Sequence, residues 1–184
     1  MYFLMTKKEK DLPNYIYKPT SNLVEYIKSL NVPVICFPRN IKNYKKSCGQ
    51  NHLKVIIGAG DLGTLRNVVK ASWVSMMAGA DFIKTSTGKE PTNATLPVSL
   101  VMIRAIRDFY DLTKKKIGFK AAGGISKSKQ AINYLILMKE ELDDDWLTKN
   151  LFRIGASSLL ADVERQLEHL STGSYSAENR HPIV

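Results

Sequence analysis

The stretch "KVIIGAGDLGTLRNVVKASWVSMMAGADFIKTSTGK" (Lys54–Lys89) contains the unit from which this 184-residue chain is built. An apolar run at 53–57 is followed by a helical pattern at 65–79 and by a second apolar run at 81–85. A strand, a helix and another strand at this spacing are typical of β/α units around a parallel sheet. The stretch therefore predicts an α/β fold.

The same unit recurs toward the end of the chain. Two further apolar runs, 117–122 and 151–156, start 36 and 34 residues after the runs that precede them. Helical patterns occupy 97–113, 126–142 and 157–173. The sequence therefore predicts four parallel strands that alternate with helices.

Residues 1–50 have a less regular pattern. The stretch at 21–30 has the pattern of a short amphipathic helix, 32–37 that of a strand and 38–40 that of a turn. We expect three parts: a divergent basic N-terminal segment (1–50) with at most one βα unit, a β/α region (51–173) and a polar C-terminal tail (174–184).

The composition argues against several classes of protein. No apolar run reaches the length of about eighteen residues that a membrane span needs, and "MYFLMTKKEK" reverses the order of a secretory signal. Cys36 and Cys48 form no C-x-x-C, and His52, His169 and His181 are scattered. We predict no metal, no membrane contact, and two free thiols in a cytoplasmic protein.

The net charge of +10 is densest near the N-terminus, where residues 1–50 carry nine Lys and Arg against three acidic residues. A nucleic-acid-binding protein would use such a patch. No recognition motif accompanies the charge, so an anionic substrate and a solvated leader are the preferred interpretation. We predict no nucleic-acid partner.

Two glycine motifs resemble nucleotide loops but fail the further requirements of such loops. Gly58–Gly63 spells G-x-G-x-x-G, yet a Rossmann unit needs an acidic residue at the end of the next strand. There Asp81 stands at the beginning of the strand and Lys84 near its end. A P-loop over "STGKE" would need Gly where Ile83 stands and Ser or Thr where Glu90 stands.

Lys84 and Lys120 occupy equivalent positions near the ends of two successive apolar strands. A single lysine there would be interpreted as extending outward to water. Adjacent parallel strands lie about 4.8 Å apart, so two lysines at equivalent positions of such strands indicate a functional site instead. Each ammonium group raises the cost of protonating the other, so one pKa falls and a nucleophilic amine results.

Small residues follow the last two predicted strands. Gly123 and Gly124 come directly after the Lys120 strand, and "GASS" (155–158) opens the last helix. Such turns let backbone N–H groups approach an anion, and the loops after the seventh and eighth strands of a (β/α)8 barrel bind phosphate. With the lysine pair, they indicate an amine facing a phosphorylated carbonyl compound.

At these residues the sequence resembles deoxyribose-phosphate aldolase, a class I aldolase family on the TIM (β/α)8 barrel. The resemblance runs from about Cys48 to about Gly173 and is carried by "GADFIKTSTGK", "NAT", "MIRAIRDF", "GFKAAGGI" and "RIGASSLL". It implies a carbon–carbon lyase of deoxyribonucleotide and carbohydrate catabolism. Such an enzyme reversibly cleaves 2-deoxy-D-ribose 5-phosphate to glyceraldehyde 3-phosphate and acetaldehyde. The Schiff base is the electron sink, so no metal or cofactor is implied.

The resemblance also implies residue roles. Lys84 matches the Schiff-base lysine, Lys120 the second lysine that tunes it and relays protons, and Lys54 a supporting lysine. The phosphate-binding positions that the resemblance implies are Ser86, Gly88, Lys89, Gly123, Gly124, Gly155, Ser157 and Ser158.

The chain departs from the family pattern at three motif sites. Gly58-Ala59 replaces a Glu-Thr pair, which makes the G-x-G-x-x-G a chance product of that replacement. Ala121 replaces a proline and Ser126 an arginine, and Lys127 is the nearest substitute cation for phosphate.

The chain also departs from the family in length, because a TIM barrel takes about 250 residues. The four units match strands five to eight, the second half, and the strand-four aspartate has no counterpart. We therefore expect a truncated half barrel that self-associates through its exposed edges. The alternative is a non-catalytic remnant that binds phosphate or a partner chain.

Overall fold

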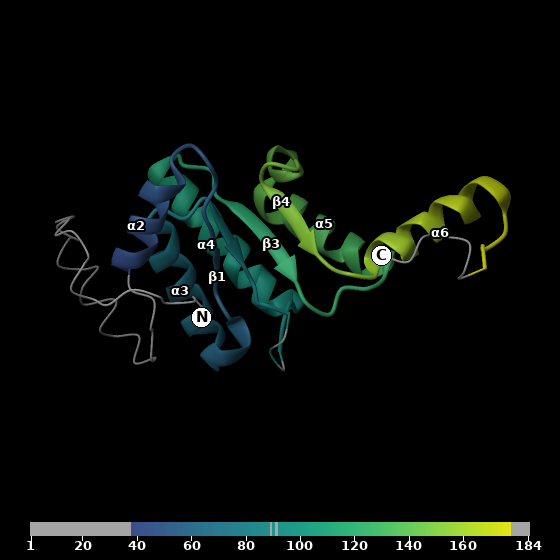
Figure 1. The fold of residues 1–184 in the computed structure, drawn as a ribbon, viewed down its shortest axis with the longest axis horizontal. Coiled ribbons are helices and arrows are strands. Elements are labelled where there is room, and N and C mark those ends of the chain that lie inside the picture. Colours follow the sequence, from purple (N-terminus) through teal and green to yellow (C-terminus); the bar gives the residue numbers. More distant parts are fainter. Residues whose placement is uncertain (1–37, 89, 91, 178–184) are drawn as a thin grey trace.

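The computed structural model describes residues 38–88, 90 and 92–177. Four parallel strands form one sheet in the order β1-β2-β3-β4 (Figure 1). The strands are β1 (Lys54–Ile56), β2 (Phe82–Lys84), β3 (Gly118–Ala122) and β4 (Phe152–Gly155). Each lies inside one of the four predicted apolar runs, so the predicted parallel α/β arrangement is confirmed.

Five α-helices and two short 3-10 helices surround these strands. The α-helices are α2 (Pro38–Cys48), α3 (Leu65–Met77), α4 (Leu96–Thr113), α5 (Ser128–Leu142) and α6 (Leu159–Thr172), and the 3-10 helices are η2 (Ala59–Leu62) and η3 (Asp144–Trp146). The starts of the four predicted helices are confirmed within two residues. Threonine caps explain two of them: the Thr64 and Thr95 hydroxyls accept hydrogen bonds from Asn67 N and Val98 N.

The turn predicted at 38–40 is wrong, because α2 begins at Pro38. Proline is tolerated in the first turn of a helix, where its missing N–H has no partner in any case. Ile41 of α2 is fully buried, and Lys45 Nζ lies 2.6 Å from Asp81 Oδ2 at the start of β2. The packed fold thus extends to the N-terminal side of residue 51. The helix expected at 21–30 and the strand expected at 32–37 lie outside the described residues.

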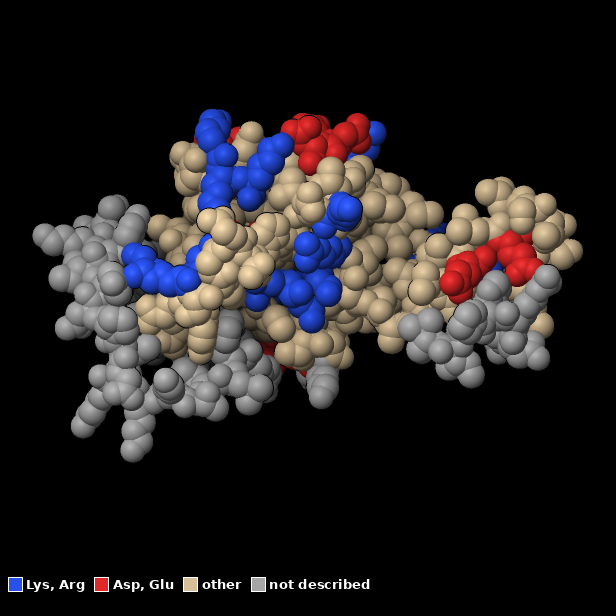
Figure 2. Space-filling view, turned by 45° about the horizontal axis from the view of Figure 1, so that its top comes forward, with Lys and Arg blue, Asp and Glu red and all other residues tan. Residues whose placement is uncertain are grey.

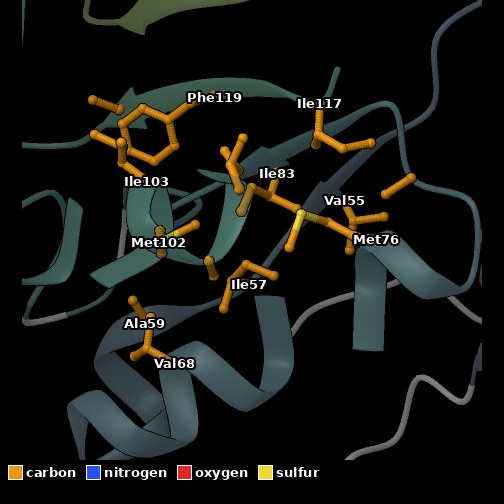
Figure 3. Close-up of a cluster of buried hydrophobic side chains, with 14 of the residues drawn as sticks. Val55, Ile57, Ala59, Val68, Met76, Ile83, Met102, Ile103, Ile117 and Phe119 are labelled. Atoms are coloured by element: carbon orange, nitrogen blue, oxygen red, sulfur yellow. The ribbon is translucent and has the colours of Figure 1, made fainter. Parts of the chain in front are cut away.

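The hydrophobic core lies between one face of the sheet and the helices (Figure 3). Val55, Ile83 and Phe119 are register partners on β1, β2 and β3, and all three are fully buried. Right-handed crossovers place successive helices on the same face of a parallel sheet. Met76 of α3 and Met102 of α4 fill the space against these strand residues. Lys54, Lys84 and Lys120 are each one residue away from a member of this buried row. Successive strand residues point to opposite faces, so the three lysines lie on the other face of the sheet.

The last helix, α6, extends away from the sheet (Figure 1). None of its residues is buried, and Leu170 is 83% exposed. The strands β1 and β4 each pair on one side only. Within the described residues, the sheet is an open half barrel with two free edges.

Candidate active site

The strand register places three cations side by side. Lys84 pairs with Lys120, which pairs in turn with Arg153 on β4. Lys54 stands two residues before Ile56, which is the β1 partner of Lys84, so its side chain points to the same face. These four residues are called the cation row below. In Figure 2, Lys and Arg gather over the middle of the molecule.

Sequence reasoning missed Arg153. It stands two residues before Gly155, just as Lys120 stands two residues before Ala122, and this equivalence was the available signal. The Arg153 guanidinium lies 4.5 Å from the centre of the Phe82 ring, and its Nε donates to Lys149 O at 3.0 Å. These contacts hold the fourth cation on the face that carries Lys84 and Lys120.

Two lysines of the cation row have lowered pKa values. Burial, followed by the positive charge of Lys120, lowers the pKa of Lys84, and Glu90 exerts an opposite and smaller effect. The pKa of Lys54 is lowered by burial and then by the positive charges of Lys120, Lys84 and Arg153. A lowered lysine pKa means that the neutral, nucleophilic amine is populated at lower pH than in an ordinary lysine.

A glycine makes room for the second lysine. A Cβ atom at Gly155 would lie 2.9 Å from Lys120 Cε and 2.8 Å from Ala122 Cβ, too close for either contact. A side chain at position 155 would therefore have to displace the end of the Lys120 side chain and the Ala122 Cβ.

A pocket of about 490 Å³ opens at the carboxyl ends of the strands. It is lined by Lys84, Thr87, Gly88, Ala122, Gly123, Gly124, Ile125, Ser126, Gly155, Ala156, Ser157 and Ser158. The loops after β2, β3 and β4 therefore meet there. Gly123 and Gly124 have φ angles of 93° and 81°, in the left-handed region that favours glycine.

The predicted site residues fall into three groups. Lys84, Gly88, Gly123, Gly124, Gly155, Ser157 and Ser158 line the pocket, whereas Lys54, Ser86 and Lys120 do not. Lys89 is outside the described residues. The buried Ser86 hydroxyl lies 2.8 Å from both Asn93 Oδ1 and Ala122 O, so it ties the β2 loop to β3.

The buried carboxylate of Glu90 organises the loop after β2. It accepts hydrogen bonds from Thr87 N, Thr87 Oγ1 and Gly88 N at 2.8–3.1 Å. Burial raises the pKa of Glu90, but these hydrogen bonds outweigh it and the net shift is downward. Glu90 opposes the lowering of the Lys84 pKa, and a carboxylate that already accepts these loop hydrogen bonds suits a structural role better than proton transfer.

The G-x-G-x-x-G stretch forms no nucleotide loop. Gly58 adopts a left-handed conformation and leads into the 3-10 helix η2. Ala59 N donates to Thr85 O at 2.9 Å, which ties this turn to the β2 loop. None of residues 58–63 lines the pocket. The prediction that this motif is not a Rossmann fingerprint agrees with a sheet whose strand order never reverses.

Two kinds of feature are absent from the described part of the chain. No helix there is long and apolar enough to cross a membrane. No group of three or more His, Cys, Asp and Glu side chains within those residues has the arrangement of a metal site. Cys48 is a free thiol, and Cys36 lies outside the described residues.

A parallel β/α sheet with adjacent lysines at its strand ends, beside a glycine- and serine-lined pocket, defines the class of β/α-barrel aldolases. The chain belongs to the DeoC/LacD aldolase family, whose model matches residues 38–163. The resemblance seen in the sequence motifs is thereby confirmed.

Named relatives agree with this family. The chain is 59% identical over 143 residues to the deoxyribose-phosphate aldolases of Mus musculus and Homo sapiens; the match covers 78% of this chain and 45% of each relative. A crystal structure from Toxoplasma gondii, described as an apo candidate deoxyribose-phosphate aldolase, superposes with a TM-score of 0.64 at 26% identity. That match covers 71% of this chain and 51% of the other. The chain thus spans about half the length of these relatives, which fits the partial barrel.

The pH profile of Lys84 tests the electrostatics of the cation row. We expect Lys120→Met to move the reaction of Lys84 with an amine-specific reagent to higher pH, because one of the charges that lowers its pKa is removed. Competitive labelling with trace acetic anhydride across a pH series, read by mass spectrometry, gives the profile. Lys120→Arg keeps the charge and should stay near the original profile. An unchanged profile in Lys120→Met would contradict the coupling.

Proposed function

We propose that the chain carries out the Schiff-base cleavage of 2-deoxy-D-ribose 5-phosphate to glyceraldehyde 3-phosphate and acetaldehyde. One observation supports this most directly. Among the described residues, Lys84 is the only Lys or Arg that lines the pocket, and it is also a lysine with a lowered pKa. An amine that becomes neutral at lower pH than an ordinary lysine therefore faces the space that a substrate would occupy.

The proposed reaction begins when neutral Lys84 Nζ attacks the C1 aldehyde carbon of the open-chain sugar. Loss of water gives a protonated Schiff base. A base removes the C3 hydroxyl proton, the C2–C3 bond breaks, and the electron pair moves into the Schiff base. Glyceraldehyde 3-phosphate leaves, and the enamine is protonated at C2. Hydrolysis then releases acetaldehyde and regenerates Lys84.

In this proposal Lys120 lowers the Lys84 pKa and relays protons, and Lys54 supports it from the neighbouring strand. The in-register pairing of Lys84 and Lys120 places the two amines on one face of the sheet. Lys120 affects the pKa of both other lysines, which gives it the central position in the cation row.

The phosphate group is assigned to the loops after β3 and β4. Their lining residues are small, so backbone N–H groups can approach an anion. The opening of α6 follows Ser158 directly and adds the partial positive charge of a helix N-terminus. The N–H groups of Thr87 and Gly88 already bond to Glu90. Gly123 N donates to Gly155 O and Ser126 N donates to Gln130 Oε1, so the donors for phosphate are assigned to Gly124 and to residues 156–158.

The rival proposal is a remnant that binds phosphate or a partner chain without turnover. The open inner face of the sheet favours it, because the cation row is not enclosed by any described element. Action in the cytoplasm, within deoxyribonucleotide catabolism, is proposed on family grounds alone. The nucleic-acid alternative gains no motif from the described residues.

Covalent trapping tests the proposed nucleophile. Incubation with acetaldehyde and borohydride should label Lys84, because its amine is neutral at lower pH and opens onto the pocket. Peptide mass spectrometry identifies the labelled lysine, and Lys84→Arg should abolish the label while Lys54→Arg should keep it. A label on Lys120 alone would reverse the two roles, and no label at all would favour the remnant.

Sedimentation velocity tests the proposed self-association. We expect the sedimentation coefficient of the purified chain to rise with concentration, because β1 and β4 present unpaired backbone groups. Leu170→Glu on exposed α6 is the control and should leave the association unchanged. A monomer at every concentration would contradict edge pairing. Loss of association in Leu170→Glu would assign it to α6 instead.

A further inference from the structure

The first turn of α6 carries a carboxylate with three donors around it. Asp162 Oδ2 accepts hydrogen bonds from Ser128 N and Ser128 Oγ, each at 2.7 Å. Asp162 Oδ1 lies 3.1 Å from Lys127 Nζ. The Asp162 side chain is only 14% exposed, although α6 has no buried residue. Asp162, Ser128 and Lys127 are called the Asp162 cluster below.

The Asp162 cluster joins the two loops to which the phosphate is assigned. Lys127 and Ser128 stand directly behind the loop that follows β3, whose residues 123–126 line the pocket. Asp162 stands four residues after Ser158, the last lining residue of the loop that follows β4. The contact therefore ties the start of α5 to the start of α6.

Few other contacts hold α6 in place. Among the described residues, α6 makes its main helix contacts with α5 and extends away from the sheet (Figure 1). No apolar side chain of α6 is fully buried, and Leu159 at its start packs partly buried against the hydrophobic core. Together with Leu159, the Asp162 cluster thus sets where α6 begins and where Ser157 and Ser158 lie.

We propose that Asp162 is a positioning residue, and that the Asp162 cluster sets the distance between the two pocket loops and thereby the affinity for a phosphate group. The inference rests on the proposed function, which assigns phosphate to this pocket. It also changes the role of Lys127. Its ammonium group pairs with Asp162 and does not line the pocket, so it acts on the loop spacing and not on the phosphate directly.

The ionisation of Asp162 fits this role. Hydrogen bonds from the Ser128 backbone and hydroxyl, aided by Lys127, lower its pKa to about 2 against the cost of burial. A depressed carboxylate pKa contributes stability above the unfolded value and loses it only as the pH falls toward about 2. The Asp162 cluster therefore stays intact throughout the neutral range.

An ordinary structural role makes a different prediction. An acidic residue in the first turn stabilises a helix through its dipole, and its loss would lower the stability of α6 without changing the pocket. A third role is also distinguishable: if Lys127 bound the phosphate itself, removing the charge of Asp162 would free Lys127 and raise the affinity.

The experiment measures inorganic phosphate binding by amide chemical shifts of Gly124 and Ser157 in the full chain. We expect Asp162→Asn to weaken phosphate binding roughly tenfold, as for a lost charge-assisted contact. Ser128→Ala, which keeps the backbone donor, should weaken it less, in the same direction. Asp144→Asn is the matched control, since Asp144 pairs with Lys139 at 3.1 Å on the exposed surface. It should change nothing.

Trapping of Lys84 by acetaldehyde and borohydride is the second readout. Acetaldehyde has no phosphate, so a pure positioning effect on the loops should leave the labelling of Lys84 unchanged in all three variants. Equal or tighter phosphate binding in Asp162→Asn would overturn the inference alone. If the original chain itself fails to bind phosphate, the phosphate assignment in the proposed function falls. Should Asp162→Asn fail to fold, normal phosphate affinity in Ser128→Ala would overturn the inference.

Discussion

The in-register pairing of Lys84 with Lys120 across two parallel strands is the constraint on which the site depends. Parallel neighbours lie about 4.8 Å apart, so the Lys120 ammonium group adds to burial in lowering the pKa of Lys84. The opposite face of the same strands stabilises this arrangement. Val55, Ile83 and Phe119 are fully buried against the helices. The lysine next to each of them in the sequence therefore points to the other face of the sheet. The apolar core on one face and the lysines on the other thus follow from one alternation.

Much of the fold and half of the site could be predicted from the sequence because both depend on local periodicity. Strand ends recur at regular intervals, and this recurrence alone identified Lys84 and Lys120 as equivalent. Two features could not be predicted in this way. The helix that begins at Pro38 depends on tertiary packing of a short apolar pattern. The role of Glu90 needs the conformation of its loop. Arg153 was missed although it occupies the position on its strand that Lys120 occupies on the preceding one.

An aldolase needs a lysine of lowered pKa and an enclosed site, and the described residues supply only the first. The tuned amine needs only neighbouring strands, which are present. Efficient turnover also needs enclosure, because excluding water strengthens the electrostatic interactions inside a site. The cation row lies on a sheet face that no described helix covers, and β1 and β4 end the sheet on either side. A catalytic group misplaced by about 1 Å can cost roughly 100-fold in rate. Under the proposed function, covalent chemistry at Lys84 and efficient turnover are therefore separable.

The steady-state rate of 2-deoxy-D-ribose 5-phosphate cleavage by the purified 184-residue chain tests this account most directly. Typical enzymes turn over at about 1–10³ s⁻¹. The account predicts trace activity, roughly 100-fold or more below that range, which Lys84→Arg removes entirely. Turnover within the typical range would contradict the claim that the open sheet holds the amine without enclosing the reaction. Equal residual rates in the original chain and in Lys84→Arg would contradict the assignment of Lys84.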